Sequence, residues 1–402
     1  MNRRFQFAVV ASSTCLVLLL LFGAVHGRGA STDGPYNHLA VYSEVLSRIN
    51  DQYVEQPDMK AVTLGAINGM LESIDPYASY LNADQYKEYL AAKGTVKAGV
   101  GIVLSRRFGY LTVVDTLPGA PAAKAGLGTG DVIESINNVS TRDMPLAYSE
   151  MLIEGAPNST VELSVLRARR AEPQKITLTR VNIAYPAVSE KLVTGQGPDP
   201  IGVIQSYTLT PERVDEIGND IKSLQQQGAK RLILDLRHCS TGDPKTGAAL
   251  ANLFLDNGLM TYSQGQKVSR ENYEAVASKD VTKLPLAVIV DRGTAGPSEI
   301  AAAALMGRRA DVVGEHTFGD AAIQSAVKLD DGSAVILSVA KFYSPDGKAI
   351  QDTGVTPNVM QAEPQPAVDS PDPDDQLIDT EPVAKPGVDD LMNRAIKVVD
   401  AK

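Results

Sequence analysis

Tryptophan is absent from this 402-residue sequence, and cysteine, histidine and aromatic residues are scarce. The chain has two cysteines and four histidines, and its aromatic residues make up 5% of the total. Cys15 lies in an N-terminal apolar run, which leaves Cys239 alone in the remainder and excludes an intrachain disulfide there. No Cys-x-x-Cys pattern is present, so the ligand spacing typical of a structural zinc site is missing.

An excess of positive charge is missing as well. Lys and Arg number 38 against 48 Asp and Glu, which gives a formal net charge of -10. No basic stripe interleaved with aromatic residues occurs, so we exclude nucleic acid as a partner. With 44% hydrophobic and 21% charged residues, the chain is typical of globular proteins and long enough for two or three domains. No cofactor is expected.

One long apolar run is present, over residues 7–25, directly after Arg3 and Arg4. Its length suits a membrane span, and the two arginines indicate that the N-terminus stays in the cytoplasm. No small-x-small cleavage site stands out after it, which favours an uncleaved signal anchor over a cleaved signal peptide. We therefore predict that residues 1–30 form a signal anchor or signal peptide. The bulk of the chain would then be extracytoplasmic, on the periplasmic side, and held at the inner membrane.

Residues 35–95 read as a small N-terminal helical segment, because apolar residues recur there at helical spacing. Three helices are expected, over Asn37–Tyr53, Met59–Ile74 and Ala83–Ala92. This segment carries no chemistry of its own.

A β-rich region follows over residues 96–183, where short strands alternate with Gly, Pro and Asn turns. Within it, Pro118-Gly-Ala-Pro-Ala-Ala-Lys-Ala-Gly-Leu-Gly-Thr-Gly-Asp-Val-Ile resembles the PDZ domain. That resemblance implies a loop whose amides receive the C-terminal carboxylate of a peptide while the peptide adds a strand to the sheet. The matching loop is Gly99-Val100-Gly101-Ile102. The alternative is a PDZ fold that serves only as a spacer or lid.

Strands and helices alternate over residues 184–362, which predicts a largely parallel sheet with covering helices. The informative stretch is a buried strand, Leu286–Val290, a turn over 291–297, and a helix from Ser298. Amides converge at such a helix start, where a developing negative charge can be stabilised. No convincing nucleophile stands at the turn. Residues 363–402 are predicted to form an acidic, Pro-rich linker and a short C-terminal helix.

Several motifs resemble the carboxy-terminal processing, or tail-specific, proteases over most of the chain. They are Asp75-Pro-Tyr-Ala-Ser-Tyr-Leu, Leu234-Asp-Leu-Arg, Val312-Val-Gly-Glu-His-Thr-Phe-Gly and Tyr343-Ser-Pro-Asp-Gly-Lys-Ala-Ile-Gln-Asp. The resemblance implies an α/β core of the ClpP/crotonase-like kind with an inserted PDZ domain. It also implies a serine peptidase whose nucleophile is activated by a lysine.

Three departures from the family pattern fall on the residues that would carry this reaction. The motif Gly293-Thr-Ala-Gly-Pro-Ser-Glu-Ile puts Gly296 at the nucleophile position, and Thr317-Phe-Gly-Asp puts Asp320 at the lysine position. The glutamine that follows the lysine is retained as Gln324. In the oxyanion loop, Thr241 replaces the first of two glycines, and Gly242 remains.

Few other residues of this chain could act as the nucleophile. Ser298 is the fallback nucleophile, with Thr294 and Cys239 as further alternatives. A weak alternative is a cysteine–histidine pair or a metal site in the same loops. Its members would be His238, Cys239, Asp243, His316 and Asp320.

The leading hypothesis is a catalytically inactive pseudoprotease that binds protein C-termini through its PDZ domain as a scaffold or regulator. Losing the nucleophile and its base costs on the order of a million-fold in turnover. The expected partners are protein or peptide C-termini, with an active relative or a second copy of the chain as further candidates. The alternative is an active endopeptidase with a displaced dyad.

Overall fold

The computed structural model describes residues 39–92, 98–107, 109–142, 144–167, 172–195, 197–362 and 388–402. The chain divides into two compact units, residues 1–66 and 67–402. In the first unit α2 (Leu39–Gln52) has no buried residue, and α3 (Met59–Glu72) begins there and continues into the second. Both helices, and α4 (Ala83–Ala92), confirm the predicted helical segment.

The predicted anchor, residues 7–25, and the predicted linker lie outside the described residues. Among the residues that the structure does describe, no helix combines the length and the apolar character that crossing a membrane requires.

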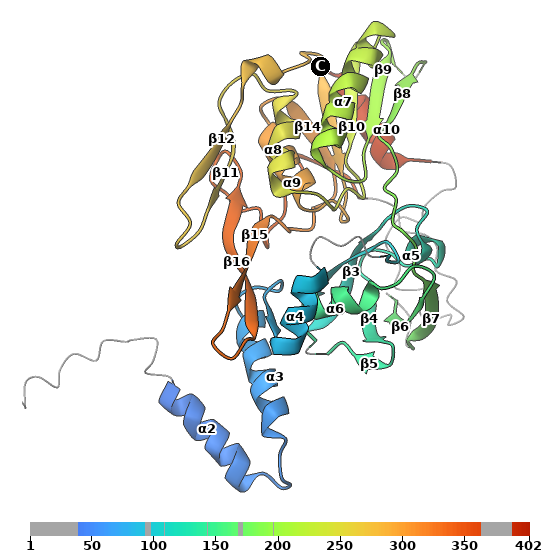
Figure 1. Ribbon diagram of the computed structural model, residues 1–402. Helices are drawn as coiled ribbons and strands as arrows, with labels where there is room; N and C mark the ends of the chain where they lie inside the picture. The colour runs from blue at the N-terminus through green and yellow to red at the C-terminus, as the bar shows by residue number, and fades with distance from the viewer. Residues whose placement is uncertain are drawn as a thin grey trace, which may run out of the picture. The chain divides into compact units, whose positions relative to one another are not determined.

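A six-stranded sheet forms the centre of the second unit, and it confirms the predicted alternation of strands and helices (Figure 1). Strand β10 pairs in parallel with β9 and β13, β13 with β14, and β14 with β17, whereas β8 joins antiparallel. The strands in spatial order are β17 (Val359–Met360), β14 (Ala310–Gly314), β13 (Leu286–Val290), β10 (Arg231–Asp235), β9 (Ile201–Gln205) and β8 (Ser189–Val193).

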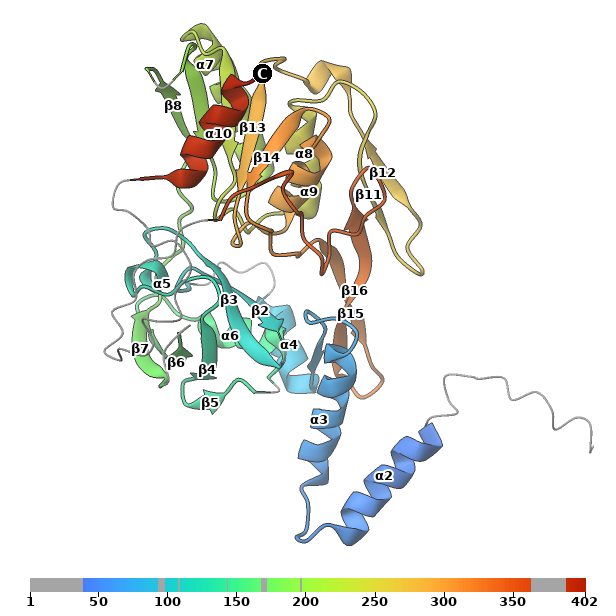
Figure 2. The ribbon, with the colours of Figure 1, turned by 180° about the vertical axis from the view of Figure 1, so that it is seen from behind.

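Successive side chains of a buried strand point to opposite sides of the sheet. Helices cover the side chains on both faces of this sheet. On one face Val288 packs in a core with α7 (Pro211–Gln226), α8 (Pro244–Asn252) and α9 (Pro297–Leu305). On the other face Ile289 packs against α10 (Asp390–Asp400), the predicted C-terminal helix, seen in front of the sheet in Figure 2.

A second sheet, built by the β-rich region, carries the PDZ-like segment. Its strand order is β2-β3-β4-β6-β7, and β5 pairs with β4. The elements are β2 (Ile102–Arg107), β3 (Tyr110–Thr116), α5 (Pro121–Lys124), β4 (Val132–Ile136), β5 (Val139–Ser140), α6 (Leu146–Ile153), β6 (Thr160–Leu166) and β7 (Gln174–Thr179). Helix α6 has no amphipathic pattern that predicts it from sequence.

A third sheet joins segments that are far apart in the chain, in the order β1-β16-β11-β12, with β15 paired to β16. Its strands are β1 (Ser79–Leu81), β11 (Leu259–Gln264), β12 (Glu271–Glu274), β15 (Ala322–Lys328) and β16 (Ala334–Tyr343). The sequence indicates strands at Ala322–Val327 and Ala334–Ala340, and β15 and β16 lie there. The expectation that they belong to the parallel sheet is wrong, because they pair antiparallel in this separate sheet. Strands β1, β11 and β12 do not appear in the sequence expectation, because short strands without clear alternation are recognisable only by their partners.

Candidate functional site

The turn between β13 and α9 holds Gly296 in a backbone conformation that favours glycine, with φ 63° and ψ -125°. A Cβ at this residue would lie 3.6 Å from the Asp320 carbonyl oxygen and 3.8 Å from the Ser240 carbonyl oxygen, which are ordinary contact distances. A side chain would therefore fit. The turn has the backbone geometry of a strained nucleophile elbow, and the residue at it has no side chain.

Pro297, the first residue of α9, changes the turn further because it has no N–H. In a nucleophile elbow, the amide of the residue after the nucleophile commonly donates to the oxyanion. This chain lacks that donor in addition to the nucleophile.

A buried carboxyl group, that of Glu299, holds the turn against the loop that carries Asp320. It accepts hydrogen bonds from the amides of Gly296 (3.0 Å), Gly319 (2.6 Å) and Asp320 (2.8 Å), and from the Thr317 hydroxyl (2.5 Å). Burial outweighs these bonds and raises the pKa of Glu299 to about 7. The two altered positions are thus fixed side by side by one side chain.

A cavity of about 290 Å³, here called the cleft, gathers the residues that the family pattern would place in an active site. Gly296, Asp320, Gln324 and Gly242 all line it. Thr241 lines the neighbouring cavity instead. The sequence motifs therefore identify residues that do come together, although their roles stay a prediction.

Asp320 places a carboxyl group in the wall of this cleft, at the position where the motif resemblance implies a lysine. Its side chain is only partly exposed, and burial, with repulsion from Asp75 and Asp352, raises its pKa to about 7. A carboxyl group in this position cannot lower the pKa of a nearby hydroxyl, because its negative charge opposes a second one.

The three substitute nucleophiles are all buried with 0% exposure, and none lines either cavity. The Thr294 hydroxyl donates to the Leu236 carbonyl and the Asp291 carboxylate, both at 2.9 Å. Burial raises the pKa of the Cys239 thiol to about 12, which disfavours the reactive thiolate. Ser298 is enclosed within the first turn of α9.

The two histidines of the alternative metal or cysteine–histidine site have different interaction partners. Nδ1 of His238 lies 2.9 Å from Asp115, and Nδ1 of His316 lies 2.9 Å from the Thr317 carbonyl oxygen. Across the described part of the chain, no group of three or more His, Cys, Asp or Glu is placed to hold a metal ion. The geometry of those residues therefore does not support the metal alternative.

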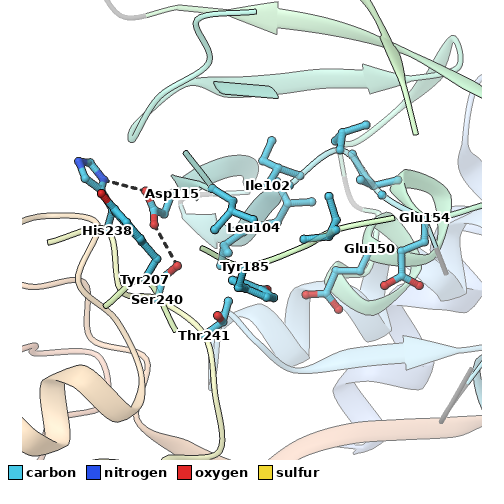
Figure 3. Close-up of a pocket in the computed structure, with 17 residues that line it drawn as sticks. Ile102, Leu104, Asp115, Glu150, Glu154, Tyr185, Tyr207, His238, Ser240 and Thr241 are labelled. Atoms are coloured by element: carbon cyan, nitrogen blue, oxygen red, sulfur yellow. Dashed lines mark hydrogen bonds and ion pairs between the residues drawn. The ribbon is translucent and has the colours of Figure 1, made fainter. Parts of the chain in front are cut away.

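A larger cavity of about 530 Å³, here called the groove, runs along the edge of β2 (Figure 3). The loop Gly99–Ile102 forms one end of its wall. Within the described residues, the amides of Val100 and Gly101 bond to no acceptor. Gly101 has φ 72°, and a Cβ there would lie 2.3 Å from that of Ala120, so the loop requires glycine. Two free amides beside an open sheet edge suit a terminal carboxylate.

Asp115 of β3 lines the groove and contacts His238 and Ser240, which follow β10 in the sequence, as Figure 3 shows. Its buried carboxylate accepts a hydrogen bond from the Ser240 hydroxyl at 3.0 Å and contacts His238 on its other side. His238 has φ 56° and also lies 3.5 Å from Asp291, so a strained residue sits between two carboxyl groups. Sequence reasoning missed Asp115, because its partners lie 123 and 125 residues away.

Three family models match the chain: "Peptidase family S41" over residues 200–360, "PDZ domain" over residues 112–167, and "Activating protease CtpB N-terminal domain" over residues 20–85. The carboxy-terminal processing protease CtpA of Bacillus subtilis is 32% identical over 359 residues, covering 88% of this chain and 74% of the relative. The carboxyl-terminal-processing protease of Picosynechococcus is 32% identical over 371 residues, covering 88% and 89%.

A solved structure supports the same assignment. The photosystem II D1 C-terminal processing protease superposes with a TM-score of 0.66 at 26% identity, covering 80% of this chain and 92% of that protein. Fold, PDZ domain and peptidase core agree with the resemblance drawn from the motifs. This chain belongs to the family of carboxy-terminal processing proteases.

Proposed function

We propose that this chain is a catalytically inactive member of its family that binds protein C-termini through its PDZ domain and acts as a scaffold or regulator. The observation that carries the proposal is the pairing of Gly296 with Asp320 at the wall of one cleft. Gly296 has no side chain that could attack a peptide bond, and Asp320 is an acid where the family resemblance places the lysine amine that activates a serine. Pro297, which follows Gly296, has no amide to offer an oxyanion.

The alternative is an active endopeptidase with a displaced dyad, and the burial of its candidates argues against it. Ser298, Thr294 and Cys239 have 0% exposure, so a peptide bond cannot reach them without local unfolding. None of these three candidates lines the cleft.

We further propose that the protein acts on the extracytoplasmic side, with residues 7–25 as its inner-membrane anchor. The apolar run and the two arginines before it support this. A partner could then be an active relative or a second copy of the chain.

Peptide binding is tested with labelled peptides that end in an apolar residue, offered to the full chain as the free acid and as the C-terminal amide. The free acid is expected to bind roughly tenfold to a hundredfold more tightly, because hydrogen bonds to a charged group contribute about 1.5–3 kcal/mol. Equal binding of the two forms would rule out carboxylate capture.

Two glycine variants locate the binding site. Gly101→Ala is expected to weaken binding of the free acid, because its Cβ meets Ala120. Gly119→Ala is the matched control: Gly119 also has positive φ, at 79°, but a Cβ there has nothing within 4 Å. If both variants lose the same affinity, backbone strain rather than the loop explains the effect.

A further inference from the structure

Two glutamates at the C-terminal end of α6 line the groove. Glu150 lies in the last turn of the helix, and Glu154 is its C-terminal capping residue one turn later. Both are exposed and both line the groove, opposite the edge of β2. Figure 3 shows their carboxyl groups beside each other on the wall of the cavity.

These two charges have no counterion in the described part of the chain, where no Lys or Arg forms an ion pair with either glutamate. Glu154 has extended backbone just beyond the last residue of α6, and its like charge repels that of Glu150. Although part of the Glu150 side chain is exposed, burial of its carboxyl group among neighbouring atoms raises its pKa to about 7, and repulsion from Asp320 and Glu154 adds to this. The pair therefore has an unfavourable electrostatic energy that a bound cation would relieve.

The acidic wall continues from the groove into the cleft. The two cavities share Val103, Leu104, Glu150 and Ser240 in their walls. Asp320 lines the cleft where family members carry a lysine, so the local charge there is reversed. A peptide that entered along β2 would thus pass carboxyl groups on α6 and approach another in the cleft.

We propose that the groove selects protein C-termini that combine an apolar terminal residue with a Lys or Arg a few residues before it. The inference rests on the proposed peptide binding and adds the class of peptide. The terminal carboxylate would meet the amides of Val100 and Gly101, and the apolar side chain would pack near Ile102 and Ile153, which line the same groove. Side chains of an added strand alternate between its faces, so an upstream residue can face α6.

A bare divalent cation fits less well than a basic side chain. Such an ion needs six or more oxygen ligands or several water molecules, and the described residues contain no group of three or more candidate ligands placed together. A lysine or arginine on a long flexible stem needs only one or two carboxylates.

The test uses three free-acid peptides of equal length with the same apolar terminal residue and with Lys, Gln or Glu upstream. Fluorescence anisotropy with the full chain is expected to give affinities in the order Lys, Gln, Glu, with the Lys peptide about fivefold tighter than the Gln peptide. The double variant Glu150→Gln/Glu154→Gln is expected to bind the Gln peptide as wild type does and to bind all three peptides alike.

Glu134→Gln is the matched control. Glu134 is an exposed glutamate of β4 in the same domain, and it does not line the groove, so its loss should leave the order unchanged. Circular dichroism confirms that each variant is folded.

The outcomes separate this inference from the proposed function. If the amidated Lys peptide binds as well as the free acid, or if no peptide binds, the proposed carboxylate capture fails and the inference fails with it. If binding requires the carboxylate but the three peptides bind alike, or if the preference survives in the double variant, only the preference for basic peptides is overturned.

Discussion

The groove and the cleft share part of one wall, yet they retain different amounts of what a processing protease requires. In the groove, the loop Gly99–Ile102 keeps the glycine, the free amides and the open strand edge that a peptide terminus needs. In the cleft, the backbone is equally well formed around Gly296, but in our proposal the side chains that would react are absent.

The difference teaches that the residues that build an active site are separate from those that react in it. Glu299 is fully buried and bonds four donors, so it is required for the local fold whatever the chemistry. Gly296 has no side chain to pack, and we expect the fold to survive a change at Gly296 or Asp320, with some backbone strain at Gly296 because of its positive φ. Three predictions test this separation.

The largest effect is expected from restoring the reacting groups in the cleft. Gly296→Ser with Asp320→Lys supplies a nucleophile and a base, and Pro297→Ala adds an amide at the helix start. Side-chain space exists at residue 296, so the triple variant is expected to cleave an unfolded protein measurably in a discontinuous gel assay. Without Pro297→Ala the rate should be roughly a hundredfold lower, since one oxyanion donor is missing.

The double variant with Pro297 intact is the control for the triple. A triple variant that is folded and binds free-acid peptides, yet remains as inactive as the unmodified chain, would show that more than these three residues separate the cleft from an active one.

A smaller effect is expected from Glu299→Gln, which keeps the size of the side chain but turns an NH2 group toward amide donors. Leaving buried donors unpaired should lower the free energy of unfolding by about 2 to 4 kcal/mol in urea titrations. Glu274→Gln, at an exposed glutamate of β12, should be neutral. Peptide affinity of the groove should stay unchanged, and a parallel loss of both would contradict the separation of the two regions.

The smallest effect is expected from Asp320→Asn and depends on pH. In the folded chain the pKa of Asp320 is raised to about 7 from 3.8, so between these values the folded state holds a proton that the unfolded state has lost. Stability therefore falls as pH rises through this window. The variant cannot ionise, so its unfolding free energy relative to wild type should rise from pH 4 to pH 8. The full pKa difference corresponds to about 4 kcal/mol, but water screens this partly exposed carboxyl group, so we expect a rise of about 1 kcal/mol.

Asp330→Asn is the control, because Asp330 is an exposed aspartate on a turn. If both variants change stability equally at the two pH values, the repulsion assigned to Asp320 is absent.

The sequence predicted most of the parallel sheet, because its strands are long apolar runs with clear breaks. It also predicted which residues meet in the cleft, since Gly296, Asp320, Gln324 and Gly242 stand at fixed offsets within recognisable motifs. Their roles remain predictions. Strand β1 was missed because only its pairing with β16 defines it.

The groove was predicted only in part. The loop Gly99–Ile102 follows from the motif, but Asp115, Glu150 and Glu154 belong to no pattern. Asp115 meets residues more than 100 positions away, and α6 is a short helix without an amphipathic stripe. Contacts of this kind depend on how two domains pack, which no local periodicity encodes.

The central claim is tested most directly by incubating the purified full chain with an unfolded protein that ends in a free apolar C-terminus and following the products by mass spectrometry. The account predicts binding without cleavage, and no change when Ser298, Thr294 or Cys239 is replaced by alanine. Cleavage that one of these single replacements abolishes would contradict it.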